Sequence, residues 1–550
     1  MIEGCQTARF NSSQRNQVSR ADTHRANKNP ETKDGIATRS AVDREPVIEQ
    51  VSGTEVDKLA SRDDLDRPKD GTISTPESTA PATTTQENTT SAPSAPAGPT
   101  QPIVLEQIVD AIYQSYPLLR IAIAGRNVAA GDNIAAQGEF DLKLKADTLN
   151  QPLGYYQTYR QGAGFDQPLF GGGNVFGGYR IGQGNFEPWY GNRETNGGGE
   201  FQLGLSVPLW QNRTVDERRA QLWRTSYGRS LVEPEIRSQV LEFVRDGSMA
   251  YWEWVAAGQN FHYAEQLLKL AQDRDQQLRT QVKEGDRPES DLTDNQRLIV
   301  SRRVKRLATL QKLQTTAVKL SLYLRMPGGL PFVPGPELLP ETFPEPLPVE
   351  RNNMEQDIAF AQSRRPELMS YDITRQQLDV DLQQAVNLLQ PSLDGQLYNS
   401  KDVGLPTSKG DKTPYQLEAG LLFSVPLQRN KAKGKITAVE GKIAQLNAKR
   451  QYASDKISVE VQAAVIALDM AYQAISQARE AIRLNEEMQK FETIKLDKGD
   501  SDFLRLNLRE TATFDARVVE VEALLRYFEA QSEYRAAVAA DLPEIITMSP

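Results

Sequence analysis

The side chains that most often build catalytic or metal centres are nearly absent from this sequence. Its 550 residues include one cysteine, Cys5, and two histidines, His24 and His262. A single cysteine allows neither a disulfide framework nor a thiolate metal site. A histidine-based catalytic or zinc centre would need more such residues brought together. Nucleophile-elbow, P-loop and metal-ligand spacings are missing too. We therefore expect no enzyme, no metal and no cofactor.

Long hydrophobic runs are also missing. No stretch of about 18 apolar residues occurs, which excludes a membrane-spanning α-helix. A soluble protein or a β-barrel remains, because closed barrels are the other structures that satisfy their backbone in lipid. The first residues, MIEGCQTARFNSSQRN, contain no apolar core of a secretory signal. Either the true start lies elsewhere or the export route is not legible in the sequence.

The charge is mildly acidic, with 64 basic residues against 73 acidic ones and a net charge of −9. No long basic patch is present, so nucleic acid is not the expected partner. Residues 1–101 are polar and rich in Ser, Thr, Pro, Asp and Arg, and we expect a disordered tail there. Cys5 lies in this tail. Gly4 would suit a lipid anchor at Cys5, but Glu3 would not, and an incidental surface thiol is the preferred interpretation.

From residue 102 onward the sequence contains two similar repeats. We expect a first repeat at 102–326 and a second at 352–542, joined by a linker at 327–351 whose eight prolines exclude a helix. Each repeat begins with a helical pattern interrupted by proline and continues with two strand-like segments. A very long helical run, a Gly-Asp turn and a shorter returning helix follow. This internal duplication is the main organisational feature of the sequence.

Four segments alternate apolar and polar side chains with the period of a β-strand. They lie at 139–148, 200–209, around 393–397 and at 415–427. Strands of about ten residues match the length of a tilted membrane-spanning strand. Four strands cannot close a barrel, but three copies would supply twelve. The alternative is a small soluble sheet packed on helices.

The segment between the first two predicted strands is unusual. Residues 149–199 hold fourteen glycines and ten aromatic residues, without the glycine spacing of a phosphate-binding loop. We expect an external loop that partly covers the mouth of the barrel with aromatic side chains near the interface. A flexible surface insertion is the alternative.

The helical runs at 211–284 and 429–498 are too long for the core of a compact domain, since about 70 residues extend roughly 105 Å. Apolar residues recur in them at spacings of three and four, as in long antiparallel helix packing. The helical segments 103–137 and 288–325 together have about the length of one long run. We therefore expect two short helices, end to end, beside each long one, with the linker at the level where they abut.

The two repeats share short motifs at corresponding places. These are Tyr116-Pro117-Leu118 and Arg365-Pro366-Glu367-Leu368, the strand–helix junctions Ser206-Val207-Pro208-Leu209 and Ser424-Val425-Pro426-Leu427, and the turns VKEGDRPESDL and LDKGDSDFL. Their order and spacing over residues 103–541 resemble the TolC-like outer-membrane efflux factors. The resemblance implies a mainly α-helical homotrimer with a twelve-stranded transmembrane β-barrel and a twelve-helix barrel that crosses the periplasm.

The resemblance also implies that the helical turns contact a periplasmic adaptor, which links to an inner-membrane pump. The matching tip positions are Gly285, Asp291, Leu292, Gly499, Asp502 and Phe503. Four further carboxylates at the turns are candidates for the pore constriction, where threefold symmetry would form rings that favour cations: Asp286, Glu289, Asp294 and Asp500. The alternative is that helix turns are acidic because such residues are solvated and favour helix N-termini.

We therefore expect a duct that performs no chemistry. It would be the outer-membrane exit channel of a tripartite efflux or type I secretion system, passing small molecules or polypeptide from the periplasm or pump to the exterior. The alternative is a soluble coiled-coil scaffold with a small β-sheet at one end, which would stay in solution without detergent and conduct nothing.

Overall fold

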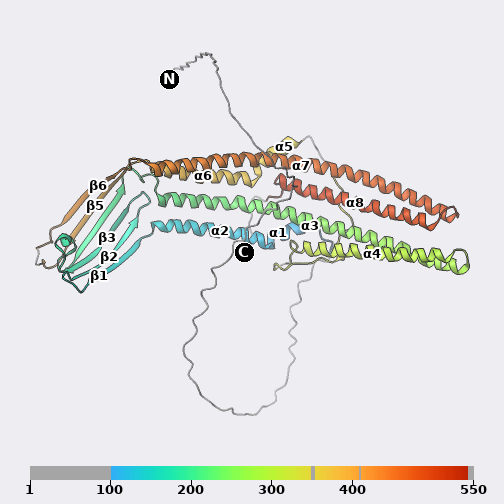
Figure 1. The fold of residues 1–550 in the computed structure, drawn as a ribbon, viewed down its shortest axis with the longest axis horizontal. Coiled ribbons are helices and arrows are strands. Elements are labelled where there is room, and N and C mark those ends of the chain that lie inside the picture. The colour runs from blue at the N-terminus through green and yellow to red at the C-terminus, as the bar shows by residue number, and fades with distance from the viewer. Residues whose placement is uncertain (1–100, 327, 349–352, 408–409, 543–550) are drawn as a thin grey trace, which may run out of the picture. The chain divides into compact units, whose positions relative to one another are not determined.

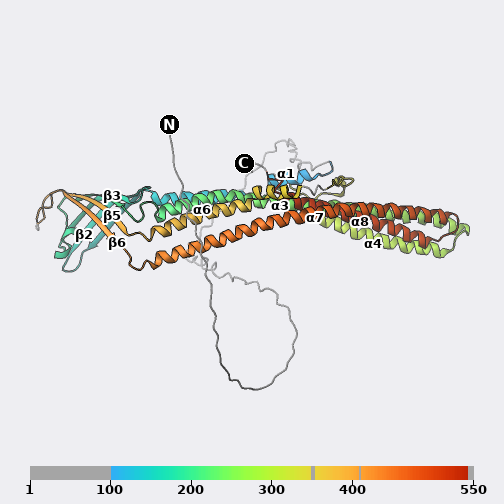
Figure 2. The same cartoon turned by 90° about the horizontal axis from the view of Figure 1, so that it is seen from above.

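A computed structural model describes residues 101–326, 328–348, 353–407 and 410–542, all within one compact unit that begins at Ser91. The predicted disordered tail and Cys5 lie outside the described residues, apart from Gln101 at its end. Figures 1 and 2 show an antiparallel sheet followed by long helices that run side by side. Among the described residues, none of the helices combines the length and the apolar character that a membrane span requires.

The elements follow one another in two similar series. The first comprises α1 (Leu105–Ser115), α2 (Pro117–Gln137), η1 (Gly138–Phe140), β1 (Lys143–Gln151), β2 (Thr158–Pro168), β3 (Asn174–Gly184), η2 (Pro188–Arg193), β4 (Glu200–Pro208), α3 (Glu217–Glu284) and α4 (Glu289–Leu320). The linker contains η3 (Pro336–Leu338), and the second series comprises α5 (Met354–Arg364), α6 (Pro366–Asn387), β5 (Ser392–Asp402), β6 (Gln416–Ser424), α7 (Asn430–Asp497) and α8 (Phe503–Ala537).

Two helices of 68 residues each, α3 and α7, organise the helical part. The shorter helices α1, α2 and α4 pack along α3, and α5, α6 and α8 pack along α7. This confirms the expected arrangement of short helices beside each long one. Proline separates α1 from α2 and α5 from α6, because Pro117 and Pro366 begin a helix while the residue before each has an extended backbone. Contacts of α3 with α6 and α8 join the two series.

The main core lies where the short helices abut. Trp252 of α3 stacks on Phe528 of α8 with ring centroids 4.2 Å apart, and Phe343 of the linker stacks on both rings. The Ile103 amide donates to the carbonyl of Leu338 in the linker over 2.9 Å. The linker therefore crosses the helices at this level, as the sequence predicted.

The sheet has six strands in the order β1-β2-β3-β4-β5-β6, so the prediction of four was wrong. The segment 149–199, predicted to be a loop, contains all of β2 and β3. Glycine disfavours strands when only propensity is considered, but here it allows two strands to approach closely. A Cβ atom on Gly164 would lie 2.5 Å from the Gly177 carbonyl oxygen, and one on Gly178 would lie 2.5 Å from that of Ala163. The first strand also starts later than predicted, because Gly138–Phe140 forms a 3-10 turn.

Candidate functional site

The sheet has one apolar and one polar face. Directly opposed residues in antiparallel strands have their side chains on the same face of the sheet. The strand register therefore shows on which face each side chain lies. The apolar face carries Leu144, Ala146, Phe165, Val175, Phe201, Leu203, Leu205, Val207, Leu397, Leu417, Leu421 and Phe423. Leu144 is 81% exposed and Leu421 69% exposed, so none of the described segments covers this face. Polar residues such as Gln161, Asn399 and Lys401 also lie on this face, but most of its side chains are apolar. A large exposed apolar surface marks a site that contacts another protein or a membrane.

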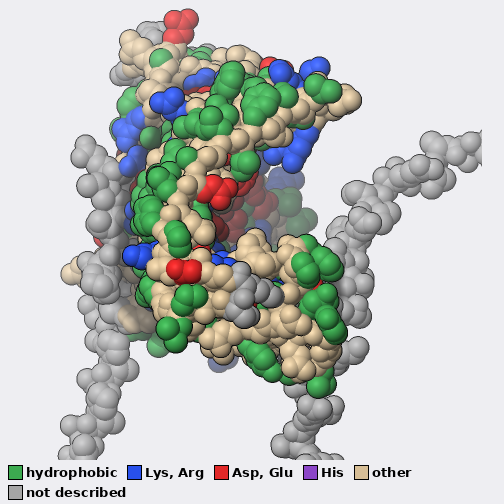
Figure 3. Space-filling model, turned by 90° about the vertical axis from the view of Figure 1, so that its left-hand side faces the viewer, with side chains coloured by type: hydrophobic (Ala, Val, Ile, Leu, Met, Phe, Trp, Pro, Cys, Tyr) green, Lys and Arg blue, Asp and Glu red, His purple; other side chains and the backbone are tan. Residues whose placement is uncertain are grey.

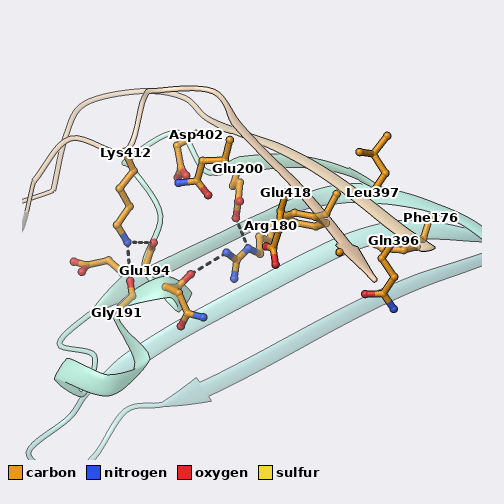
Figure 4. Close-up of a pocket in the computed structure, with 14 residues that line it drawn as sticks. Phe176, Arg180, Gly191, Glu194, Glu200, Gln396, Leu397, Asp402, Lys412 and Glu418 are labelled. Carbon is orange, nitrogen blue, oxygen red and sulfur yellow. Dashed lines mark hydrogen bonds and ion pairs between the residues drawn. The ribbon is translucent and has the colours of Figure 1, made fainter. Parts of the chain in front are cut away.

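The polar face is hollowed and carries most of the charge of the sheet. Its inward side chains include Lys143, Lys145, Asp166, Arg180, Glu200, Gln202, Gln396, Asp402, Gln416 and Glu418. Several of them line a cavity over β3, β4, β5 and β6 (Figure 4). Figure 3 looks onto this end of the unit, where hydrophobic side chains gather along the outer band and acidic side chains are visible in the hollow. One face is therefore suited to lipid and the other to water.

Hydrogen bonds tie the loops at the far end of the sheet to each other. Arg180 Nε donates to Glu200 Oε2 over 2.5 Å, and its Nη2 donates to the Asn192 carbonyl over 2.9 Å. Lys412, in the loop between β5 and β6, donates through Nζ to the carbonyls of Gly191 and Glu194 (Figure 4). Loops of both hairpin regions are thus held together on the polar side.

The two helical turns at the opposite end each depend on a glycine. Gly285 ends α3 with φ +86°, and Gly499 follows α7 with φ +80°. A Cβ atom at either position would meet nothing within 4 Å, so backbone conformation and not space requires glycine. The next amide in each turn, that of Asp286 or Asp500, donates back to the helix over 2.9 Å. Both turns are therefore built in the same way.

Replacing Gly499 by alanine should destabilise its turn by about 1–2 kcal/mol, because a left-handed backbone is unfavourable for a residue with a Cβ atom. The matched control is Gly434→Ala inside α7, where a Cβ atom also meets nothing within 4 Å. That change should stabilise the helix by about 0.5–1 kcal/mol. Hydrogen exchange of the amides around residues 490–505 measures the first effect. Equal exchange rates in Gly499→Ala and the parent protein would contradict this explanation.

The structure brings the two predicted tip segments together. The Arg287 guanidinium, in the connection between α3 and α4, lies 5.0 Å from the ring centroid of Phe503, which begins α8. Asp291 lies in the first turn of α4, 3.9 Å from Arg287, and Leu292 beside it is half-buried. Asp502 is the N-cap of α8, because its carboxylate accepts the Arg505 amide over 2.8 Å.

The candidate constriction carboxylates are on the surface of the single chain. Asp286, Glu289, Asp294 and Asp500 are exposed, and Asp294 lies 3.6 Å from Arg297. Nowhere in the described part of the chain do three or more His, Cys, Asp or Glu residues form a group that could hold a metal ion.

The prolines at the two strand–helix junctions differ in burial. Pro208 is buried at the end of β4, opposite Asp394, whereas Pro426 is exposed between β6 and α7.

A buried charge cluster that the sequence did not predict lies between α3, α4 and α8 and is formed by Arg274, Arg302 and Glu510. These residues are 8%, 4% and 3% exposed. Glu510 accepts from Arg274 and, over 2.7 Å, from Arg302 Nη2. Arg302 also donates to the Leu267 carbonyl over 2.7 Å, and burial lowers the pKa of Arg302. One carboxylate thus holds arginines from two other helices.

A weak signal of this cluster exists in the sequence. Glu510 lies four residues after Leu506 and four before Phe514, which are both buried, so it occupies an apolar seam position of α8. Arg274 lies eleven residues before Gly285, roughly 16 Å along the helix at 1.5 Å per residue. The cluster therefore joins the two helical hairpins a short distance from the tip.

No family model matches the chain, and no curated protein matches it in sequence. Solved structures match its fold. The outer membrane protein VceC of Vibrio cholerae has a TM-score of 0.56 at 14% identity, with 79% of this chain and 95% of that chain covered. The Campylobacter jejuni outer membrane channel CmeC has a TM-score of 0.56 at 12% identity, covering 79% and 85%. The Neisseria gonorrhoeae outer membrane channel MtrE, in its open state, has 0.55 at 14%, covering 79% and 88%.

These similarities establish the fold. The chain shares the fold of these outer membrane proteins, which is the TolC-like fold that the resemblance in sequence predicted.

Proposed function

We propose that this chain is one protomer of an outer-membrane exit channel in a tripartite efflux or type I secretion system. It would pass small molecules or polypeptide from the periplasm or pump to the exterior. The observation that carries the proposal is the two-faced sheet: its strands have 9 to 11 residues, the length of a tilted membrane strand, and expose leucine on one face and charge on the hollow one. Such a wall separates lipid from a water-filled path.

The proposed assembly is a homotrimer in the outer membrane, with the helices extending into the periplasm. Within the described residues, β1 and β6 each have only one neighbouring strand, so both sheet edges carry free backbone groups. In lipid these groups must be paired, and copies of the same chain supply the missing partners. We further propose that the two series of elements derive from a duplication, with 327–351 as the linker between repeats.

The tip is the proposed docking surface for a periplasmic adaptor and, through it, an inner-membrane pump. Its residues are those of the two turns: Gly285, Asp291, Leu292, Gly499, Asp502 and Phe503. The adjacency of Arg287 and Phe503 supports this assignment, since it joins both turns into one surface. We propose that the chain itself performs no catalysis and that the pump supplies the energy.

The proposal is tested by extracting the protein from membranes in detergent, measuring its mass by light scattering and recording conductance in a planar bilayer. We expect a mass of three protomers and discrete conducting events. A water-soluble monomer without conductance would contradict the proposal and favour the coiled-coil scaffold.

The turn carboxylates should set ion selectivity if the tip is the constriction. Changing Asp500 and Asp502 to asparagine removes two carboxylates per protomer, while asparagine at 502 keeps the helix cap. We expect the ratio of cation to anion permeability to fall, because carboxylate rings favour cations. Reversal potentials in a salt gradient measure this ratio. The control is Glu480→Gln, which removes an exposed carboxylate within α7, away from the turn. Unchanged selectivity in the double variant would exclude the ring.

A further inference from the structure

We propose that the hairpin β2–β3 is part of the membrane wall, so that three copies close a barrel of eighteen strands. The sequence led us to expect twelve strands, with the same segment as a loop over the mouth. Three copies of a six-stranded sheet supply eighteen. This inference rests on the proposed function, because it concerns the wall of the same channel.

The hairpin is inserted between its neighbours along its length. β1 pairs with β2 from Lys143–Asp166 to Gln151–Thr158, and β3 pairs with β4 from Asn174–Ser206 to Arg180–Glu200. β1 and β4 are therefore separated by two strands and do not pair with each other. A loop folded over the mouth would leave β1 and β4 as neighbours.

The hairpin also continues the two faces of the sheet. Phe165 and Val175 lie on the apolar face, while Asp166 and Arg180 lie on the polar face. Ion pairs on the polar face join it to both neighbours: Lys145 Nζ of β1 lies 2.8 Å from Asp166 Oδ2, and Arg180 Nε lies 2.5 Å from Glu200 Oε2 of β4. The hairpin thus has the side-chain pattern of a strand pair between lipid and water.

The turn of the hairpin is anchored where the sheet meets the helices. Gln167 donates to the Phe140 carbonyl over 2.7 Å, and Phe170 stacks on Phe140 at 4.2 Å between centroids. Gly173 has φ +81°, and a Cβ atom there would overlap the Ser206 carbonyl oxygen. These contacts hold the turn against both η1 and β4, so the hairpin is built into the wall and does not swing as a surface insertion.

The edge strands β1 and β6 pair with a second copy of this chain. An even number of antiparallel strands makes β1 and β6 run in opposite directions, so β6 of one copy can pair antiparallel with β1 of the next. Both edge strands have 9 residues. On the polar face β1 carries Lys143, Lys145 and Asp147 while β6 carries Glu418, so the two edges have opposite net charge. Since barrel diameter grows roughly linearly with strand number, the lumen would be about 1.5-fold wider than that of twelve strands.

The deciding experiment is a cryo-electron microscopy map of the full-length protein in lipid nanodiscs. We expect a trimer with eighteen strands. The matched variant replaces residues 155–195 with a short Gly-Ser linker, and we expect twelve strands and a barrel about 1.5-fold narrower. A trimeric ring in which β1 pairs directly with β4 would overturn the inference but leave the channel proposal intact. A monomer without a ring would overturn both. If the shortened variant does not fold, the strand count of the parent protein still decides.

Disulfide trapping in membranes gives an independent answer. In a Cys5→Ser background, Ala146→Cys with Ala163→Cys should form an intrachain disulfide, because these residues face each other across β1 and β2. Ala146→Cys with Phe201→Cys should not, since three strand spacings place them roughly 14 Å apart, beyond disulfide reach. The opposite result would place β1 beside β4 and overturn the inference.

Discussion

Leu203→Arg is expected to prevent most of the protein from reaching a stable membrane-inserted state, whereas Gln202→Arg should be tolerated. The two residues are neighbours in β4 and lie on opposite faces of the sheet. Leu203 is 53% exposed on the apolar face, and arginine facing lipid near the middle of a membrane strand costs about 2–4 kcal/mol. At position 202 the same side chain would face the polar hollow, near Glu200.

Comparing the two variants shows which face of the sheet contacts lipid, because both variants add the same side chain to the same strand. The denaturant midpoint of protein folded into lipid vesicles gives the free energy difference, and the fraction recovered in the membrane pellet gives the effect in cells. If both variants insert equally well, the apolar face does not contact lipid. The soluble scaffold would then be the better explanation.

Removing the Glu510 carboxylate should strongly destabilise the helical region. Glu510→Gln would leave Arg274 and Arg302 buried without their shared counter-charge. Breaking a buried ion pair by removing one partner costs about 3–5 kcal/mol, mainly because the remaining charge stays out of water. We expect a lower thermal midpoint and faster hydrogen exchange in α3, α4 and α8 around the cluster.

A suitable control is Glu265→Gln, which also breaks an ion pair between α3 and α4. Its carboxylate lies 2.8 Å from Arg306, and the two side chains are 43% and 35% exposed. Such an exposed pair contributes about 0–1 kcal/mol because water screens it. A loss for Glu510→Gln no larger than that for Glu265→Gln would show that the cluster does not hold the helices together.

The long helices could be predicted from the sequence because the spacing of apolar residues that identifies a helix is local. Apolar residues at spacings of three and four report which side of a helix is covered, and proline or glycine marks the ends. The predicted run 429–498 corresponds to α7 at Asn430–Asp497, and 288–325 contains α4. The predicted tip turns at Gly285 and Gly499 also lie where the chain reverses.

Strands could be predicted from the sequence only where apolar and polar side chains alternate. β4 and β6 were found because leucine and phenylalanine recur at every second residue. β2 and β3 were missed because Gly162, Gly164, Gly177 and Gly178 contribute no side chain to the alternation. Their strand conformation is stabilised by neighbours on both sides, which sequence periodicity does not report.

The buried cluster shows a second limit. Glu510 and its two arginines are 236 and 208 residues apart in the chain. Charged residues normally lie at the surface, so the position of Glu510 in an apolar seam does not by itself identify Arg274 and Arg302 as its partners on other helices.

The sequence by itself determined the order and length of the helices and the two-faced pattern of β4 and β6, because each depends on residues close together in the chain. Only the tertiary structure decided the number of strands, the pairing of β4 with β5 across the linker and the partners of the buried charges. These features depend on which distant segments become neighbours. Backbone hydrogen bonds and buried charges are satisfied by position in space and not by position in sequence.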